Sequence, residues 1–135
     1  MSTIRVMMIG EYPLDPTVMP GGVTAVAHHL VKGLARQPEI DLHMVCCQPE
    51  VARDQTTERD GATIHFLNSA GRFNQLTNWA RQRRKIARLA GRVQPDIVHG
   101  QGLGLPAAVA LTLGRPFGIA LHGVIWRETH LDHPS

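Results

Sequence analysis

Two consecutive glycines, Gly21 and Gly22, follow a proline and begin a run with helical periodicity. The first amide groups of a helix have no intrahelical acceptor, and where no Cβ atoms shield them they are open to a phosphate or a carboxylate. The preceding loop, 10–20, contains three prolines, which fix φ and hold this connection extended. A diglycine after a proline is also an ordinary turn, and it lacks the specificity of a complete phosphate-binding loop. The pattern therefore indicates either an anion site or a simple turn.

Two histidines, His99 and His122, each stand at the end of an apolar run and are followed by glycine. An imidazole with a pKa of about 6.5 can donate or accept a hydrogen bond at neutral pH, although a lone histidine at a strand end is often only a structural residue. The segment 100–104 reads Gly-Gln-Gly-Leu-Gly, a weak match to a dinucleotide fingerprint. We expect its glycines to let a ligand or a neighbouring loop approach the strand end.

Short apolar runs predict parallel strands, and apolar periodicity predicts the helices between them. The strands are expected at 4–9, 41–47, 62–67, 94–100 and 116–123, and the helices at 22–37, 73–93 and 105–113, whereas the charged segment 50–60 is expected to be structureless. Strands that alternate with helices indicate an α/β fold, a Rossmann-like doubly wound parallel sheet. Ligands of such sheets bind at the carboxyl ends of the strands, so the diglycine and both histidines are expected at one rim.

The two longer helices are expected to be amphipathic. In the first, the apolar stripe comprises Val23, Val26, Ala27, Leu30, Val31 and Leu34. In 73–93 the apolar face comprises Leu76, Trp79, Ala80, Ile86, Ala87, Ala90 and Val93, with Arg83 on the same side. The other face carries a basic stripe of Arg81, Arg84, Lys85, Arg88 and Arg92. We interpret this stripe either as a solvated helix face or as a surface for anionic lipid headgroups or an anionic acceptor.

The bulk composition is that of one globular domain. The chain has 135 residues, of which 43% are hydrophobic and 19% are charged, and its net charge of +3 is too small to demand nucleic acid. The two cysteines, Cys46 and Cys47, are adjacent on a strand and point to opposite faces, so a structural disulfide between them and a metal site are not expected. With neither a membrane-spanning run nor a signal peptide, the chain is expected to be cytoplasmic.

Three motifs in this order carry a resemblance to a known family. They are Pro-Gly-Gly-Val at 20–23, Pro-Asp-Ile-Val-His at 95–99 and Leu-His-Gly at 121–123. Together they resemble the N-terminal domain of GT-B-fold glycosyltransferases, and most of all the family-4 retaining type. The resemblance extends from Ile4 to about Glu128. It implies a Rossmann-like acceptor-binding domain that faces a C-terminal donor domain across a cleft.

The resemblance also implies roles for particular residues. The amides of Gly21 and Gly22 would contact the diphosphate of a nucleotide-sugar donor, and His122 would touch the transferred sugar as the catalytic histidine. The acceptor, a glycan or a lipid-linked molecule, would be contacted by His99, Gln101, Glu11 and Tyr12. Such enzymes need no metal, because helix amides and basic side chains offset the phosphate charge, and this agrees with the absence of an Asp-x-Asp motif from the sequence.

The departure from the family pattern is large, because the donor domain is missing and the usual last elements of the N-terminal domain are missing after Glu128. We therefore expect a sheet that is incomplete at its C-terminal end, in a fragment that does not transfer sugar alone. An alternative is a stand-alone binding or regulatory module that docks peripherally on the inner membrane face or on a partner through the basic helix 81–92. A nicotinamide-dependent dehydrogenase is disfavoured, because the first loop lacks Gly-x-Gly-x-x-Gly and Gln48 stands where an acidic residue would end the second strand.

Overall fold

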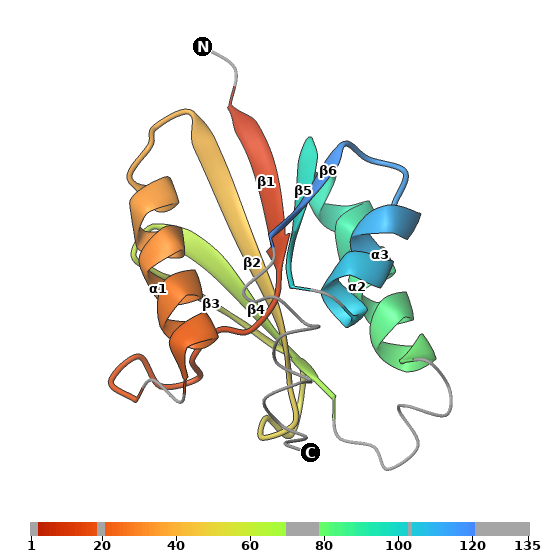
Figure 1. Cartoon of the computed structure of the whole chain (residues 1–135), viewed down its shortest axis with the longest axis horizontal. Helices are drawn as coiled ribbons and strands as arrows, with labels where there is room; N and C mark the ends of the chain where they lie inside the picture. Colours follow the sequence, from red (N-terminus) through yellow and green to blue (C-terminus); the bar gives the residue numbers. More distant parts are fainter. Residues whose placement is uncertain (1–2, 19–20, 70–78, 103, 121–135) are drawn as a thin grey trace, which may run out of the picture.

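Strands and helices alternate along the part of the chain that this computed structural model describes, residues 3–18, 21–69, 79–102 and 104–120 (Figure 1). The strands are β1 (Ile4–Ile9), β2 (Ile40–Gln48), β3 (Gln55–Arg59), β4 (Ala62–Asn68), β5 (Ile97–Gln101) and β6 (Phe117–Ala120). The helices are α1 (Gly22–Ala35), α2 (Ala80–Val93) and α3 (Leu105–Thr112). β1 has the bounds that the apolar run predicts.

The strands form one sheet in the order β3-β4-β2-β1-β5-β6, and every neighbouring pair is parallel except β3 with β4. From β1 the chain crosses through α1 to β2 on one side, whereas β5 lies on the other side of β1 and continues through α3 to β6. Because right-handed crossovers in opposite directions place their helices on opposite faces, the sheet is doubly wound. The predicted fold class is therefore confirmed, and the topological switch point lies between β1 and β5.

The core consists of two layers, one on each face of the sheet. Alternate residues of β1 point to opposite faces, so Met7 and Met8 belong to different layers. On one face Val31 of α1 packs with Met8, Met44 and Phe66. On the other, α2 and α3 pack on the sheet through Ile86, Leu89, Val109 and Ala110. Figure 1 shows this arrangement, with α1 on one side of the sheet and α2 and α3 on the other.

The expectation that segment 50–60 is structureless is wrong. Its second half forms β3, which pairs antiparallel with β4 from Gln55↔Phe66 to Arg59↔Ala62. The two strands are joined at Asp60 and Gly61, which have φ values of 54° and 88°. Two successive residues with positive φ match the right-handed twist of a hairpin, and Asp-Gly is a favoured sequence for such a turn. This dipeptide was the signal that should have identified the hairpin.

The buried faces of α1 and α2 also differ from the predicted apolar stripes. In α1 the buried residues are Thr24, Ala27, His28 and Val31, whereas Val26 and Leu30 are 49% and 37% exposed. In α2 the residues Gln82 and Leu89 are buried and Ala87 is exposed, and Leu76 lies outside the described residues. The reason in α1 is tertiary: the chain after β1 brings polar and aromatic partners to Thr24 and His28, so these side chains turn inward in place of the larger apolar ones.

Candidate functional site

The carboxyl ends of β1 and β5 meet at Gly10 and Gln101. A Cβ atom added to Gly10 would lie 2.5 Å from Cβ of Gln101, so only glycine lets the chain leave β1 this close to its neighbour. The strands are in register here, with Ile9 opposite Gly100. Parallel sheets bind ligands where neighbouring strands send their connections to opposite faces. We call this place, together with the start of α1, the switch-point rim.

The start of α1 is open at the backbone. Gly21 is the N-cap residue with extended dihedral angles, φ −173° and ψ 172°, and no described side chain caps the helix. Any residue adopts this extended conformation, and a Cβ at Gly21 or Gly22 would meet no atom within 4 Å. The fold therefore does not require glycine at either position. What the two glycines provide is access to the first amides of α1, which lack intrahelical acceptors.

Glycines also shape the connection from β5 to α3. A Cβ at Gly100 would lie 3.0 Å from the carbonyl oxygen of Pro106, in the first turn of α3. Gly102, with φ 109°, donates its amide hydrogen to the carbonyl oxygen of Ala120 at 2.8 Å. The sequence predicts that these glycines admit a ligand or a neighbouring loop; at Gly100 the segment that approaches is instead the first turn of α3.

Glu11 and Tyr12, the two predicted acceptor contacts after β1, occupy different environments. Glu11 is exposed, and its Oε2 accepts a hydrogen bond from the Thr24 hydroxyl at 3.3 Å, which places the first turn of α1 beside the end of β1. Tyr12 is only 2% exposed; its ring centroid lies 6.0 Å from that of His28 and 6.3 Å from that of Phe66. Burial raises the pKa of its hydroxyl, in spite of the nearby Arg59. This placement favours a supporting role for Tyr12.

His99 and Gln101 lie together at the end of β5. Gln101 Nε2 and His99 Nδ1 are 2.8 Å apart, and Gln101 is 4% exposed while His99 is half-buried. β6 runs parallel to β5, and its last residue, Ala120, pairs with Gln101. The described chain therefore ends at this rim, two residues before His122, which itself lies outside the described residues.

Sequence reasoning missed Arg59, which fixes the loop after β1. Its guanidinium donates hydrogen bonds to the carbonyl oxygens of Pro13 at 2.8 Å and Leu14 at 2.6 Å. It also lies 5.2 Å from the ring centroid of Phe66 and 6.0 Å from that of Tyr12, within the range of cation–π contacts. Arg59 belongs to β3, the strand that was not predicted, so its partner could not be named. Through this residue the edge hairpin positions the loop that carries Glu11.

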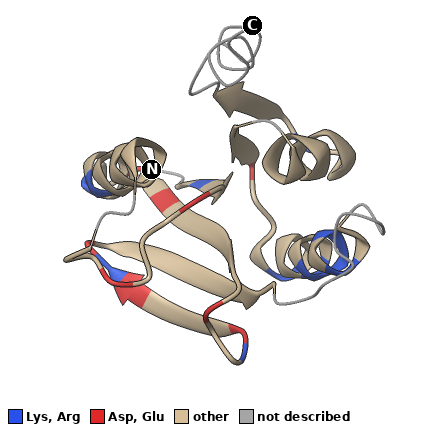
Figure 2. Ribbon diagram, turned by 60° about the horizontal axis from the view of Figure 1, so that its bottom comes forward, with Lys and Arg blue, Asp and Glu red and all other residues tan. Residues whose placement is uncertain are grey.

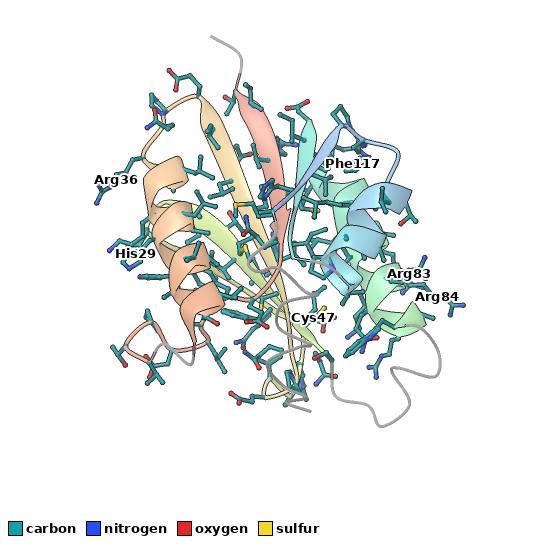
Figure 3. The ribbon with its side chains drawn as sticks, in the orientation of Figure 1. His29, Arg36, Cys47, Arg83, Arg84 and Phe117 are labelled. Atoms are coloured by element: carbon teal, nitrogen blue, oxygen red, sulfur yellow. The ribbon has the colours of Figure 1, made fainter. Side chains whose placement is uncertain are left out.

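Four of the five residues of the predicted basic stripe, Arg81, Arg84, Arg88 and Arg92, are exposed on α2. Figure 3 shows Arg83 and Arg84 pointing away from the sheet near the start of the helix. Figure 2 shows that basic residues gather on α2. Lys85 departs from this stripe, because its Nζ lies 2.8 Å from Asp54 Oδ1 and 3.2 Å from the carbonyl oxygen of Asn68. Lys85 therefore links α2 to the end of β4.

The cysteines do not provide a nucleophile. Both are free thiols, and burial raises the pKa of Cys46 to about 11 and that of Cys47 to about 12. Both thiols are therefore protonated at neutral pH. No three His, Cys, Asp or Glu side chains converge as metal ligands within residues 3–18, 21–69, 79–102 and 104–120. None of the described helices is long and apolar enough to cross a membrane.

Comparisons with known proteins agree with this architecture. The family profile described as Glycosyltransferase Family 4 matches residues 20–134. Among solved structures, the chain is similar to an alpha,alpha-trehalose-phosphate synthase (UDP-forming) from Burkholderia vietnamiensis, with a TM-score of 0.60 and 15% sequence identity. The similarity covers 90% of this chain and 34% of that one, so the chain spans about a third of the length of that protein. At this identity the likeness shows the fold alone. None of the curated protein sequences matches the chain significantly.

Proposed function

The chain belongs to glycosyltransferase family 4 and has the Rossmann-like half of a GT-B fold, and from this premise we propose that it is the acceptor-binding part of a retaining glycosyltransferase. The reaction would move a sugar from a nucleotide-sugar donor to a glycan or lipid-linked acceptor, and the sugar would keep its anomeric configuration. A second lobe would hold most of the donor. The described chain would supply the acceptor side and a cap for the diphosphate.

The observation that supports this proposal most is the open start of α1 at the switch-point rim. Gly21 and Gly22 leave the first amides of the helix accessible, and the bond between Thr24 and Glu11 holds this turn beside the end of β1. Amides that are fixed before the reaction stabilise the charge that develops on the departing diphosphate, without a cost for reorienting them. In this proposal they offset the phosphate charge in place of a metal ion.

The remaining rim residues would contact the acceptor and the transferred sugar. Glu11 is exposed and His99 is half-buried, so these two side chains can hydrogen-bond the hydroxyls of an acceptor. Gln101 is 4% exposed and would orient the His99 ring through the contact between them. Tyr12 would support them from the core. His122, which follows β6 by two residues, would contact the transferred sugar and hold it for attack on the face that the leaving group vacates.

The experiment is a titration of the ¹⁵N-labelled chain with pyrophosphate, the part of the donor that the rim is proposed to bind. We expect the amide signals of Gly21, Gly22 and Val23 to shift together, because these groups would contact the anion. Gly22→Val should weaken binding about tenfold, since its side chain would cover the amides. Gly33→Val is the matched control, because a Cβ there also meets no atom within 4 Å but lies at the other end of α1.

Equal weakening in Gly22→Val and Gly33→Val would contradict the proposal, because the effect would then come from the helix as a whole. Absence of shifts at the start of α1 at saturating pyrophosphate would contradict it as well. Far-ultraviolet circular dichroism of both variants checks that the fold is retained.

A second candidate function, docking on an anionic membrane, is favoured by the exposed side chains of Arg81, Arg84 and Arg88 on α2. Arginines near an anionic surface contribute about 1 kcal/mol each, and salt weakens the attraction. Charge reversal of all three should abolish binding to phosphatidylglycerol vesicles at low salt. Arg36→Glu, on the outer side of α1 (Figure 3), is the control and should bind nearly as well as the unmodified chain. Failure of the unmodified chain to bind these vesicles would remove this candidate.

A further inference from the structure

A groove lies between α2 and the β3–β4 hairpin, away from the switch-point rim. It consists of two adjoining cavities of about 550 Å³ and 610 Å³, which share four lining residues, Thr56, His65, Leu89 and Arg92. One cavity extends to Arg5 and Asp41 at the amino ends of β1 and β2. The other extends to Asp54 and Lys85 at the carboxyl end of β4. We call these two cavities together the α2 groove.

The floor of the α2 groove is a row of polar side chains on three neighbouring strands. His43 Nδ1 and His65 Nε2 are 3.0 Å apart, and His65 Nδ1 lies 3.1 Å from the Thr56 hydroxyl. The two imidazoles are stacked, with ring centroids 5.3 Å apart and an angle of 11° between their planes. Burial, with His43 and Arg92 nearby, lowers the pKa of His65 to about 4, so this ring is neutral at neutral pH. A polar floor suits a hydrophilic ligand better than the apolar face of a helix.

The charges around the groove are balanced at its two ends but not between them. Arg5 pairs with Asp41 at 3.0 Å, and Lys85 pairs with Asp54 at 2.8 Å. Arg88 and Arg92 also line the groove, and no carboxylate of the described chain forms an ion pair with either. Residues four apart on a helix are neighbours on one face, so the two guanidiniums can reach the same oxyanion. Guanidinium groups bind phosphate through paired, charge-assisted hydrogen bonds.

From these observations we propose that the α2 groove binds a phosphate group, with Arg88 and Arg92 as its charged ligands and the Thr56–His65 row as the polar wall beside it. The phosphate belongs either to a free phosphorylated compound or to a lipid headgroup, since the recognition chemistry is the same. This site is separate from the proposed diphosphate site, because its lining residues lie on α2, on β1–β4 and just before β3, and none belongs to the switch-point rim.

The test uses inorganic phosphate as the probe, at low ionic strength, with the ¹⁵N-labelled chain. We expect the Arg92 backbone amide and the imidazole nitrogens of His43 and His65 to shift in one saturable process. Arg92→Gln should raise the Kd for phosphate about tenfold or more, because a charge-assisted pair is lost. Arg83→Gln is the matched control, since Arg83 lies on the same helix and does not line either cavity. The Kd of this variant for phosphate should be unchanged.

A second variant, Thr56→Val, removes the hydroxyl of the floor without changing any charge, and it should raise the Kd several-fold. Vesicles that contain a phosphomonoester lipid test the headgroup as the source. If Arg92→Gln weakens their binding and Arg83→Gln does not, the ligand is a lipid headgroup held in the groove. Equal effects of Arg83→Gln and Arg92→Gln on phosphate would overturn the proposal. So would an absence of shifts at His43 and His65 on saturation, because the anion would then lie outside the groove.

Discussion

At the switch-point rim the positive charge comes from backbone amides, whereas in the α2 groove it comes from arginine side chains. The amides at the rim are accessible because Gly21 and Gly22 have no Cβ atoms. The groove is lined by two guanidinium groups and by a hydrogen-bonded row of polar residues. Fixed amides suit a charge that develops during a reaction, since they need no reorientation. Flexible arginines suit a ligand whose charge is constant. The two proposed sites would therefore bind anions in different ways.

The strongest prediction concerns sugar transfer by the rim without a second lobe. If a second lobe supplies most of the donor site, the 135-residue chain should transfer no sugar above the uncatalysed rate from any nucleotide hexose, because the rim provides only one side of the reaction. Radiolabelled transfer assays with glycan and lipid acceptors measure this. Sugar transfer by the isolated chain would show that the rim is a complete active site, and the two-lobe proposal would fail.

The loop after β1 at the rim is expected to depend on the β3–β4 hairpin, which also borders the groove. Arg59→Ala should lower the free energy of unfolding by about 2 to 3 kcal/mol, because two hydrogen bonds from a charged group to the loop after β1 are lost. Urea denaturation measures the change. Arg53→Ala, an exposed arginine that precedes β3, should change it by less than about 0.5 kcal/mol. Similar values for the two variants would mean that the hairpin does not position the loop.

The close approach of β1 and β5 can be tested at Gly10. Gly10→Ala should destabilise the chain by about 1 to 3 kcal/mol, because the new Cβ would lie 2.5 Å from Cβ of Gln101. The same change at Gly33 in α1 should instead stabilise it by about 0.5 to 1 kcal/mol, since a Cβ there meets no atom and alanine favours helix. Thermal unfolding of both variants measures these opposite changes in stability. A neutral Gly10→Ala would show that the strand ends separate more easily than the structure indicates.

The smallest of these effects is a pH dependence of the free energy of unfolding, which His65 in the groove floor should cause. The folded chain holds the pKa of His65 at about 4, below the ordinary value of 6.5, so between these values the unfolded chain binds a proton that the folded chain does not. Stability should therefore fall by about 1 to 2 kcal/mol as the pH drops from 6.5 to 4, which is less than the full shift would give because solvent screens the partly buried ring. His65→Gln should reduce this slope, whereas His29→Gln, on the solvent side of α1, should leave it unchanged.

The two regions also differ in how far they can be predicted from the sequence. The rim depends on local backbone signals, the prolines and glycines at strand ends, and such signals are visible in one stretch of chain. The parallel sheet follows from apolar runs of the same kind, which is why β1 has its predicted bounds. The carboxyl ends of parallel strands lie at the same edge of a sheet, and this rule alone predicts that these signals share one rim.

The groove could not be predicted, because it depends on which strands are neighbours. His43, Thr56 and His65 come together only when β2, β4 and β3 lie side by side in a particular register. The segment that contains Thr56 has no apolar periodicity, so β3 was missed although Asp60-Gly61 marked the turn. In α1, inward-facing Thr24 and His28 were missed for a similar reason: their partners Glu11 and Tyr12 are brought to them by the loop.

The proposed function requires that the start of α1 and His122 act on one donor at one rim. We would titrate the ¹⁵N-labelled chain with a nucleotide-diphosphate sugar and follow the Gly22 amide and the His122 imidazole in the same samples. We predict that both signals shift and give one Kd, because the diphosphate and the sugar belong to the same molecule. Saturation of the Gly22 signal with no change at His122 would contradict the claim, since the histidine would then lie away from the bound donor.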